Sequence, residues 1–341
     1  MSTGNTDSYD LAAVDSKGVI REDIMEKIWL IDKFPLPFTD KTSKITSGNS
    51  FKEYVTDELG ASAVDNKHVD GVDVDQDDSA LGERMGNYHQ TALKEIQISK
   101  RANANNSVGR MGTLSYQVSR GQQRLRRDVE SQMITHQPSI AGDSATPGQS
   151  AGIGAQLKTN VYTGATGSAG GFNHTTGIFD APTPGTAAAL SETTLRDAAQ
   201  AIYEEGGNTA CVMGTPAVIR LISEYLFSDT ARVATMTNQD TSSENMTAYG
   251  SANVFITDFG QVLRLEDNRL QKQDDTDTSS LYLLDPKYLF QSFITGYQTE
   301  PLAKTGLSEK RLISCDYSLI CTSEKSQGVI MAIDETTAMI A

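Results

Sequence analysis

Met111-Gly-Thr-Leu-Ser-Tyr-Gln-Val-Ser-Arg-Gly-Gln-Gln-Arg-Leu-Arg-Arg-Asp-Val-Glu-Ser-Gln-Met-Ile-Thr-His136 is the stretch on which the fold depends. Its large apolar residues recur at gaps of three, four or seven, the period of one helical face: Met111, Leu114, Val118, Leu125, Val129 and Met133. A helix over the whole stretch is about 39 Å long at ~1.5 Å per residue. The pattern predicts a long amphipathic helix with one stripe on a sheet and its other faces available to neighbours.

Two glycines interrupt this helix, and charged residues cover its other faces. Gly112 and Gly121 each cost roughly 1 kcal/mol relative to alanine, so a bend or a close approach of another segment is expected there. The charged residues are Arg120, Arg124, Arg126, Arg127, Asp128 and Glu130. Opposite charges four apart, at 124–128 and 126–130, predict two ion pairs along the helix.

Composition sets limits on the fold and the partners. A chain of 341 residues exceeds the usual single core and predicts two or more lobes. The formal net charge of -15 argues against a nucleic-acid binder and against an anionic membrane surface as partner. The odd number of cysteines (Cys211, Cys315 and Cys321) without a CxxC pair predicts three buried free thiols.

The first 46 residues predict an arm without a core of its own. Residues 1–17 are polar and resemble no signal peptide, and no apolar run in the chain approaches the ~20 residues of a membrane span. We therefore expect a soluble protein made in the cytoplasm. A helical stripe with Trp29 beside it follows, and Pro35 and Pro37 end it. Such a segment is expected to lie along another lobe or another subunit.

Residues 47–101 predict a thin β-ribbon. Strands are expected at Phe51–Asp57 and Tyr88–Ile98, on either side of an aspartate-rich excursion. A lone hairpin is marginal in water, so its apolar face needs a cover from outside. This is a sign of a quaternary partner.

The remaining chain predicts loops, an α/β lobe and a sheet. Residues 138–189 are rich in Gly, Ser, Thr and Ala and predict a long loop region. Residues 191–226 predict helix, buried strand and helix, the second helix starting at Thr215-Pro216. The last third predicts an antiparallel sheet on which the long helix packs.

Catalytic and metal-binding motifs are weak in this sequence. Gly148-Gln-Ser150-Ala-Gly152 matches the GxSxG nucleophile elbow, but neither a buried strand before it nor a helix after it is predicted. Asp73, Asp75 and Asp77 resemble the opening of an EF-hand loop, but Asp78 stands at the glycine position and Arg84 at the bidentate glutamate position. The four histidines have no metal-ligand spacing. No cofactor, metal site or enzymatic activity is predicted.

Short sequence segments along the chain resemble those of a known family. The chain is similar to tailed-bacteriophage major capsid proteins of the Hong Kong 97-like fold. The phrases that carry the resemblance, in family order, are Gly18–Ile24, Pro37-Phe38, Gly86–Gln90, Tyr116-Gln117, Leu125–Glu130, Glu204–Gly207, Asp258–Gly260, Asp285–Tyr288 and Thr299–Arg311. The last run and the ordered set are the specific part.

The resemblance implies an α+β fold with four parts. They are an N-terminal arm (1–46), an extended β-hairpin loop (47–101), a peripheral domain with the long spine helix (102–140 and 281–341) and an α/β axial domain (141–280). In the acidic tip and the Gly/Ser-rich stretch the chain departs from the family, so contacts there are not carried over. The chain has no extra N-terminal domain of the size that acts as a built-in scaffold, which implies a separate scaffolding protein.

The function implied is that of a virion shell subunit assembled in the cytoplasm of a bacterial host. Copies are expected to form hexamers and pentamers of an icosahedral shell, with a portal, around double-stranded DNA that is not specifically bound. The candidate contacts between subunits are Arg124, Arg127, Asp128, Glu130, Trp29 and Phe38; for the helix charges, an ordinary solvated face is the competing interpretation. The alternative functions are an encapsulin-like nanocompartment shell and, more remotely, a serine hydrolase using Ser150.

Overall fold

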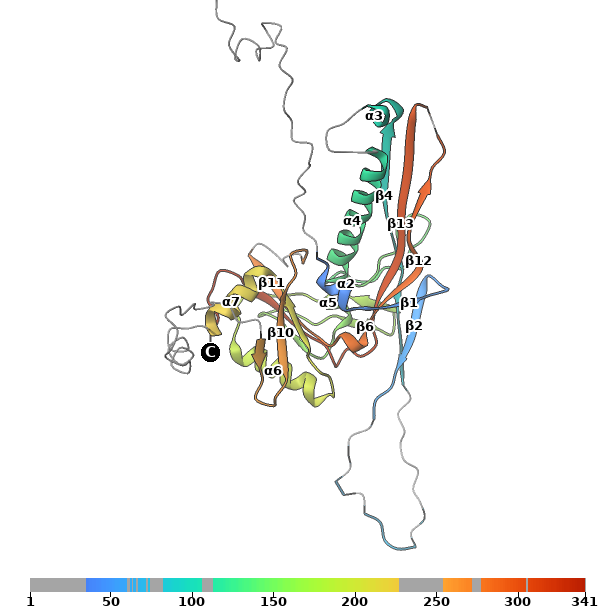
Figure 1. The fold of residues 1–341 in the computed structure, drawn as a ribbon. Coiled ribbons are helices and arrows are strands. Elements are labelled where there is room, and N and C mark those ends of the chain that lie inside the picture. Colours follow the sequence, from blue (N-terminus) through green and yellow to red (C-terminus); the bar gives the residue numbers. More distant parts are fainter. Residues whose placement is uncertain are drawn as a thin grey trace, which may run out of the picture.

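Two sheets and one long helix form the body of the protein, and a β-hairpin leaves it (Figure 1). The computed structural model describes residues 35–105, except 60, 61, 63, 66, 72 and 74–81, and residues 113–226, 254–271, 277–304 and 306–340. The predicted α+β class is confirmed.

The first sheet has four strands in the order β1 (Ser43–Thr46), β12 (Leu289–Pro301), β13 (Ser308–Cys321) and β4 (Gln90–Ser99). β12 and β13 form a long antiparallel hairpin, β4 pairs antiparallel with β13, and β1 pairs parallel with β12. The short helix α3 (Lys100–Ala104) follows β4. This sheet forms the long, upright part of the molecule in Figure 1.

The long helix α4 (Thr113–Met133) packs on β4 and β13, as the sequence predicts for its apolar stripe. Leu125, Val129 and Met133 are fully buried in this contact. Gly121 lies at its closest point, because a Cβ there would stand 2.6 Å from Ile96 Cδ1 and 2.7 Å from Ile313 Cδ1. The glycine thus permits the close approach of helix and sheet. The helix ends at Met133, three residues before the predicted end.

The second sheet has six strands, in the order β5 (Val161–Tyr162), β14 (Gly328–Asp334), β11 (Thr278–Leu284), β8 (Cys211–Gly214), β10 (Val262–Asp267) and β9 (Val254–Ile256). The helices α6 (Glu192–Glu204) and α7 (Pro216–Leu226) share a buried cluster with one face of it, through Leu195, Ile222 and Leu283. The predicted helix, buried strand and helix are confirmed.

The sequence predicts one antiparallel sheet in the last third of the chain, and this prediction is wrong. The strands of the last third divide between the two sheets. β11 and β14 belong to the six-stranded sheet, whereas β12 and β13 belong to the four-stranded sheet. The switch occurs at the short helix η2 (Pro286–Tyr288), where the Asp285 carboxylate accepts a hydrogen bond from the Lys287 N–H. The predicted domain boundary at 280/281 therefore does not coincide with a boundary between the sheets.

One core connects the two sheets. On the face of the six-stranded sheet away from α6 and α7, Met213, Tyr282 and Met331 belong to the same buried cluster as α4 and β13. The two sheets thus share one buried cluster, to which α4 contributes Leu125, Val129 and Met133.

The β-ribbon is shorter than predicted. Its strands are β2 (Phe51–Thr56) and β3 (Glu83–Tyr88), paired antiparallel. The predicted strand at 88–98 is β4, which follows after His89 and pairs with β13 instead. Exposed and partly buried residues alternate along β4, because α4 packs on one face of the sheet. Figure 1 shows β2 running away from the body.

The remaining elements are short. They are α2 (Pro37–Lys41) in the arm and, in the predicted loop region, α5 (Ile153–Gln156), β6 (Gly171–Asn173) and β7 (Ile178–Asp180). The three cysteines are free and buried, as predicted, and Cys315 and Cys321 lie on the same strand.

Candidate functional site

Glu130 joins three segments of the chain. One carboxylate oxygen accepts hydrogen bonds from the Phe38 N–H and from Asn268 Nδ2, both at 2.8 Å. The other accepts from the Thr39 N–H at 2.7 Å and from the Thr39 hydroxyl at 2.5 Å. The side chain is 0% exposed. Glu130 is thus bonded within the chain, and not at the subunit surface where the sequence places it.

This junction fixes the end of the arm. The first N–H groups of a helix have no partner inside it, and Glu130 satisfies those of α2. Phe38, also predicted at a subunit contact, is buried in the core that contains Leu125 and Val129. Lys41 adds an ion pair to Glu266 on β10 at 2.8 Å. The arm is therefore tied to both the helix and the six-stranded sheet at residues 38–41.

The two ion pairs predicted along α4 do not form as expected. Asp128 pairs with Lys94 on β4 at 2.6 Å, and both side chains are nearly half exposed. Arg126 lies over the ring of Tyr297, 5.2 Å from its centroid, while Glu130 is bonded to the arm. The neighbouring sheet offers nearer partners than the next helical turn does.

The other candidate contacts differ in their positions. Arg124 is exposed and lines a hollow of about 490 Å³ between α4 and β4, together with Ile96 and Ile98. Arg127 is partly buried, and its Nε has no hydrogen-bond partner among the described residues. Trp29 lies outside the described residues. Among the described candidates, Arg124 and Asp128 are thus the most accessible to a neighbour.

The base of the ribbon is fixed by a buried polar cluster. Asn87 Nδ2 donates to the Leu319 carbonyl at 2.7 Å, and Asn87 Oδ1 accepts from the Ala151 N–H at 3.0 Å. The ring of His89 bonds the Ser50 carbonyl and the Ser292 hydroxyl. Burial lowers the pKa of His89, so the neutral ring is the favoured form. The Gly86–Gln90 segment thus anchors the base of the ribbon to the body.

Ser150 belongs to this same cluster and is not arranged as a nucleophile. It is 2% exposed, and its hydroxyl accepts from the Leu319 N–H and from Asn87 Nδ2, both at 3.2 Å. A serine nucleophile needs a base within hydrogen-bond reach, and none of its bonded partners is a histidine. The GxSxG match is a structural loop, although the short helix α5 does follow it.

Metal and membrane sites are not found among the described residues. No group of three His, Cys, Asp or Glu side chains in that part of the chain is placed to hold a metal ion. Asp75, Asp77 and Asp78 of the EF-hand-like run lie outside it. No described helix is long and apolar enough to cross a membrane.

The roles of Asn87 and Asn268 are not predicted by the sequence patterns. Each is fully buried and uses its amide to join segments distant in sequence, 232 residues apart for Asn87 and Leu319. A lone asparagine carries no periodic signal, so only its place in the Gly86–Gln90 phrase pointed to Asn87.

Comparison with known proteins gives one family. A family model described as SU10 major capsid protein matches residues 2–334. No curated protein sequence matches the chain.

Solved structures share the fold at low identity. A capsid of an empty GTA particle computed with C5 symmetry has a TM-score of 0.60 at 10% identity, covering 94% of this chain and 97% of that one. A structure of Mycobacterium phage Adephagia has a TM-score of 0.59 at 8% identity, covering 98% and 99%. The holo-SrpI encapsulin complex from Synechococcus elongatus PCC 7942 has a TM-score of 0.54 at 11% identity, covering 96% and 97%.

Proposed function

The chain belongs to the SU10 major capsid protein family, and on this premise we propose that its copies assemble into the icosahedral shell of a tailed phage around double-stranded DNA. It is a major capsid protein with the Hong Kong 97-like fold. The observation that carries the assembly proposal is the β2–β3 hairpin, which leaves the body and exposes apolar side chains such as Val55.

The outer half of the hairpin makes few contacts with its own body, chiefly an ion pair between Glu58 and Lys325 at 2.6 Å and the partly buried ring of Tyr54. At its base, the rings of Phe51 and Tyr88 pack with centroids 4.5 Å apart. Farther out, Val55 is 66% exposed and Leu59 is 96% exposed. A two-stranded sheet is marginal in water unless something covers its apolar side. A neighbouring subunit is the proposed cover.

Charge favours the surface of α3 and α4 as the place where a neighbour's hairpin lies. Residues 57–78 carry eight carboxylates and only one lysine: Asp57, Glu58, Asp65, Asp70, Asp73, Asp75, Asp77 and Asp78, with Lys67. The helices present Lys100, Arg101, Arg120 and Arg124. The hollow beside Arg124, with Ile96 and Ile98 in its lining, offers apolar surface next to these cations. Opposite charges steer such an encounter and fix its register.

The two sheets take the two domain roles of the family in this proposal. The four-stranded sheet with α4 is the peripheral domain, and the six-stranded sheet with α6 and α7 is the axial domain, so β11 and β14 move to the latter. Hexamers and pentamers of such subunits build the shell. The contact residues proposed on the helix are Arg124, Arg127 and Asp128, with Trp29 of the arm.

The remaining partners follow from charge and from the family. With a net charge of -15 per subunit, the proposed shell repels DNA and does not bind it specifically, which suits a capsid into which DNA is packaged. A separate scaffolding protein and a portal are the proposed assembly partners, and the cytoplasm of a bacterial host is the proposed site. The protein acts as a structural component and not as an enzyme.

A nanocompartment shell is the second candidate. The similarity to the SrpI encapsulin complex over 97% of that chain favours it as the alternative. The contents of purified particles separate the two functions, because absorbance at 260 nm relative to 280 nm reports nucleic acid. Protein cargo without DNA supports the nanocompartment.

The test of assembly is electron microscopy of the full chain expressed with its scaffolding protein. We expect closed shells from the unmodified chain, and soluble subunits without shells after deletion of residues 60–81 or after Arg124→Glu. Arg220→Glu, an exposed change on α7, is the control and should leave assembly unchanged. An unmodified chain that stays monomeric at high concentration contradicts the shell function.

A further inference from the structure

The outer face of the β9–β10 hairpin is an apolar surface at the end of the six-stranded sheet. The register pairs Val262 with Ile256 and Arg264 with Val254, so these side chains share one face. Val254, Ile256 and Val262 are 46%, 66% and 48% exposed. The alternate residues Phe255 and Leu263 are buried on the other face, against α6 and α7. The outer face is thus an apolar part of the surface of the described chain.

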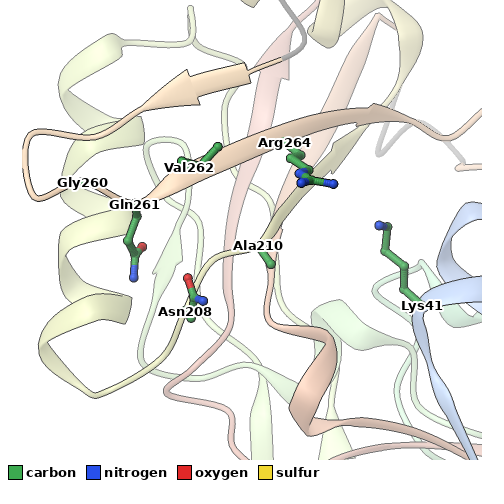
Figure 2. Close-up of a pocket in the computed structure, with 7 residues that line it drawn as sticks. All are labelled: Lys41, Asn208, Ala210, Gly260, Gln261, Val262 and Arg264. Carbon is green, nitrogen blue, oxygen red and sulfur yellow. The ribbon is translucent and has the colours of Figure 1, made fainter.

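A hollow of about 520 Å³ adjoins this surface and carries positive charge (Figure 2). Lys41 and Arg264 lie on one side of it, and Asn208 and Gln261 lie on the other. Lys41 is paired with Glu266. Arg264 makes no ion pair with any of the described residues. The hollow therefore suits a carboxylate that brings apolar surface with it.

The outer surface of α6 has this complementary character. Asp197, Glu204 and Glu205 are exposed there. Tyr203 is 50% exposed and stacks on Phe259, with ring centroids 4.9 Å apart. An aromatic side chain flanked by carboxylates matches an apolar face flanked by an unpaired arginine.

Within one subunit, α6 and the exposed face of the β9–β10 hairpin lie on opposite sides of the sheet. Helix α6 packs on the face of the sheet that holds Phe255 and Leu263, opposite the face that holds Val254 and Ile256. Tyr203 reaches the turn of its own hairpin at Phe259, but Ile256 and Val262 lie on the opposite face of the sheet. Two different complementary surfaces on one chain produce head-to-tail contacts, which close into a ring when the rotation permits.

We propose that the β9–β10 face of one subunit binds the outer surface of α6 of a second copy. Tyr203 of the second copy covers Ile256 and Val262, and a carboxylate beside it, from Glu204, pairs with Arg264. The inference rests on the proposed shell function and adds to it a specific contact between lobes. Each subunit uses both surfaces, one with each neighbour.

Disulfide trapping in assembled particles tests the contact. The native thiols are buried, so introduced cysteines react selectively. Particles assembled from equal amounts of the Ile256→Cys and Tyr203→Cys chains should give cross-linked dimers under a mild oxidant, and the doubly substituted chain should give a ladder of higher oligomers. The Leu307→Cys chain, with an exposed residue elsewhere, should give no dimers with Tyr203→Cys.

Charge exchange gives an independent test. Arg264→Glu should lower the yield of particles at least tenfold, and Glu204→Arg on the same chain should restore it. Normal particles without the Ile256–Tyr203 cross-link overturn this contact and leave the shell function intact. That outcome, with Ile256→Cys protected from thiol reagents, assigns the surface to another occupant, such as residues 1–34. Absence of particles from the unmodified chain defeats the shell function itself.

Discussion

The body of the subunit and the hairpin that leaves it are stabilised in different ways. In the body, even the charged Glu130 is fully buried and all four of its hydrogen bonds are made within the chain. In the hairpin, alternate residues of β2 and the outer residues Glu83 and Arg84 of β3 are exposed, and so is the apolar Val55. The core around Glu130 is thus completed within one subunit, whereas the proposed shell supplies the cover of the outer hairpin from a neighbour. Contacts within one subunit stabilise the fold, whereas the proposed contacts of the hairpin with a neighbour stabilise the shell.

Glu130→Ala should have the largest effect on the body. It leaves the N–H groups of Phe38 and Thr39 and the amide of Asn268 without their acceptor, so we expect a loss of about 2–4 kcal/mol in the free energy of unfolding. Urea unfolding followed by circular dichroism measures it. Glu95→Ala, at a half-exposed residue of β4, is the matched control and should change stability by less than ~0.5 kcal/mol. Equal effects of the two substitutions refute the role of the junction.

Gly121→Val tests the close approach of α4 to the sheet. A side chain there meets Ile96 and Ile313 at less than 3 Å, so we expect a loss of about 1–3 kcal/mol from overpacking. Ser119→Val, at an exposed position of the same helix, introduces the same side chain without the clash and with little change in helix propensity. The difference between the two unfolding midpoints measures the packing contribution. Equal midpoints would mean that the side chains of the sheet rearrange without cost and that glycine is not required at position 121.

His89 tests the boundary between the body and the hairpin. Because burial lowers its pKa in the folded state, the unfolded chain binds the proton more readily. The stabilisation is full above the ordinary histidine pKa of about 6.5 and is lost as the pH falls below it. Thermal unfolding at pH 7 and pH 5 should show a larger drop for the unmodified chain than for His89→Gln. Identical drops exclude His89 as the source.

Val55→Asp should have the smallest effect on the isolated subunit. The side chain is mostly exposed, so the free energy of unfolding should change by less than ~0.5 kcal/mol. Assembly should nevertheless fall, because a carboxylate would then be buried against the neighbour. Urea unfolding and electron microscopy of the same preparation check both halves. A variant that forms normal shells contradicts the covered hairpin.

Periodicity predicted the parts of this fold that local sequence determines. The stripe of α4 and the segment that forms α6, β8 and α7 were correct because one face of each element meets the core. The division of the last third between two sheets was missed, since it depends on a turn at Asp285 and on pairing with distant strands.

For the candidate contact residues, the sequence likewise predicted the side of the helix but not the partner segments. Arg124 and Asp128 lie on the accessible side of α4, as their place on the helix indicates. Glu130 differs, because its partners Phe38 and Asn268 come from 92 and 138 residues away. Helical spacing gives the direction of a side chain but not the segment that it meets.

Hydrogen exchange of the hairpin amides tests the central claim most directly. In isolated subunits, amides of the outer half of β2 and β3 (residues 53–56 and 83–85) should exchange rapidly, while those of β13 are protected. In assembled particles, the hairpin amides should become at least tenfold slower, and those of β13 should change little. Equal hairpin exchange in subunits and particles would contradict the claim that a neighbouring subunit completes this part of the fold.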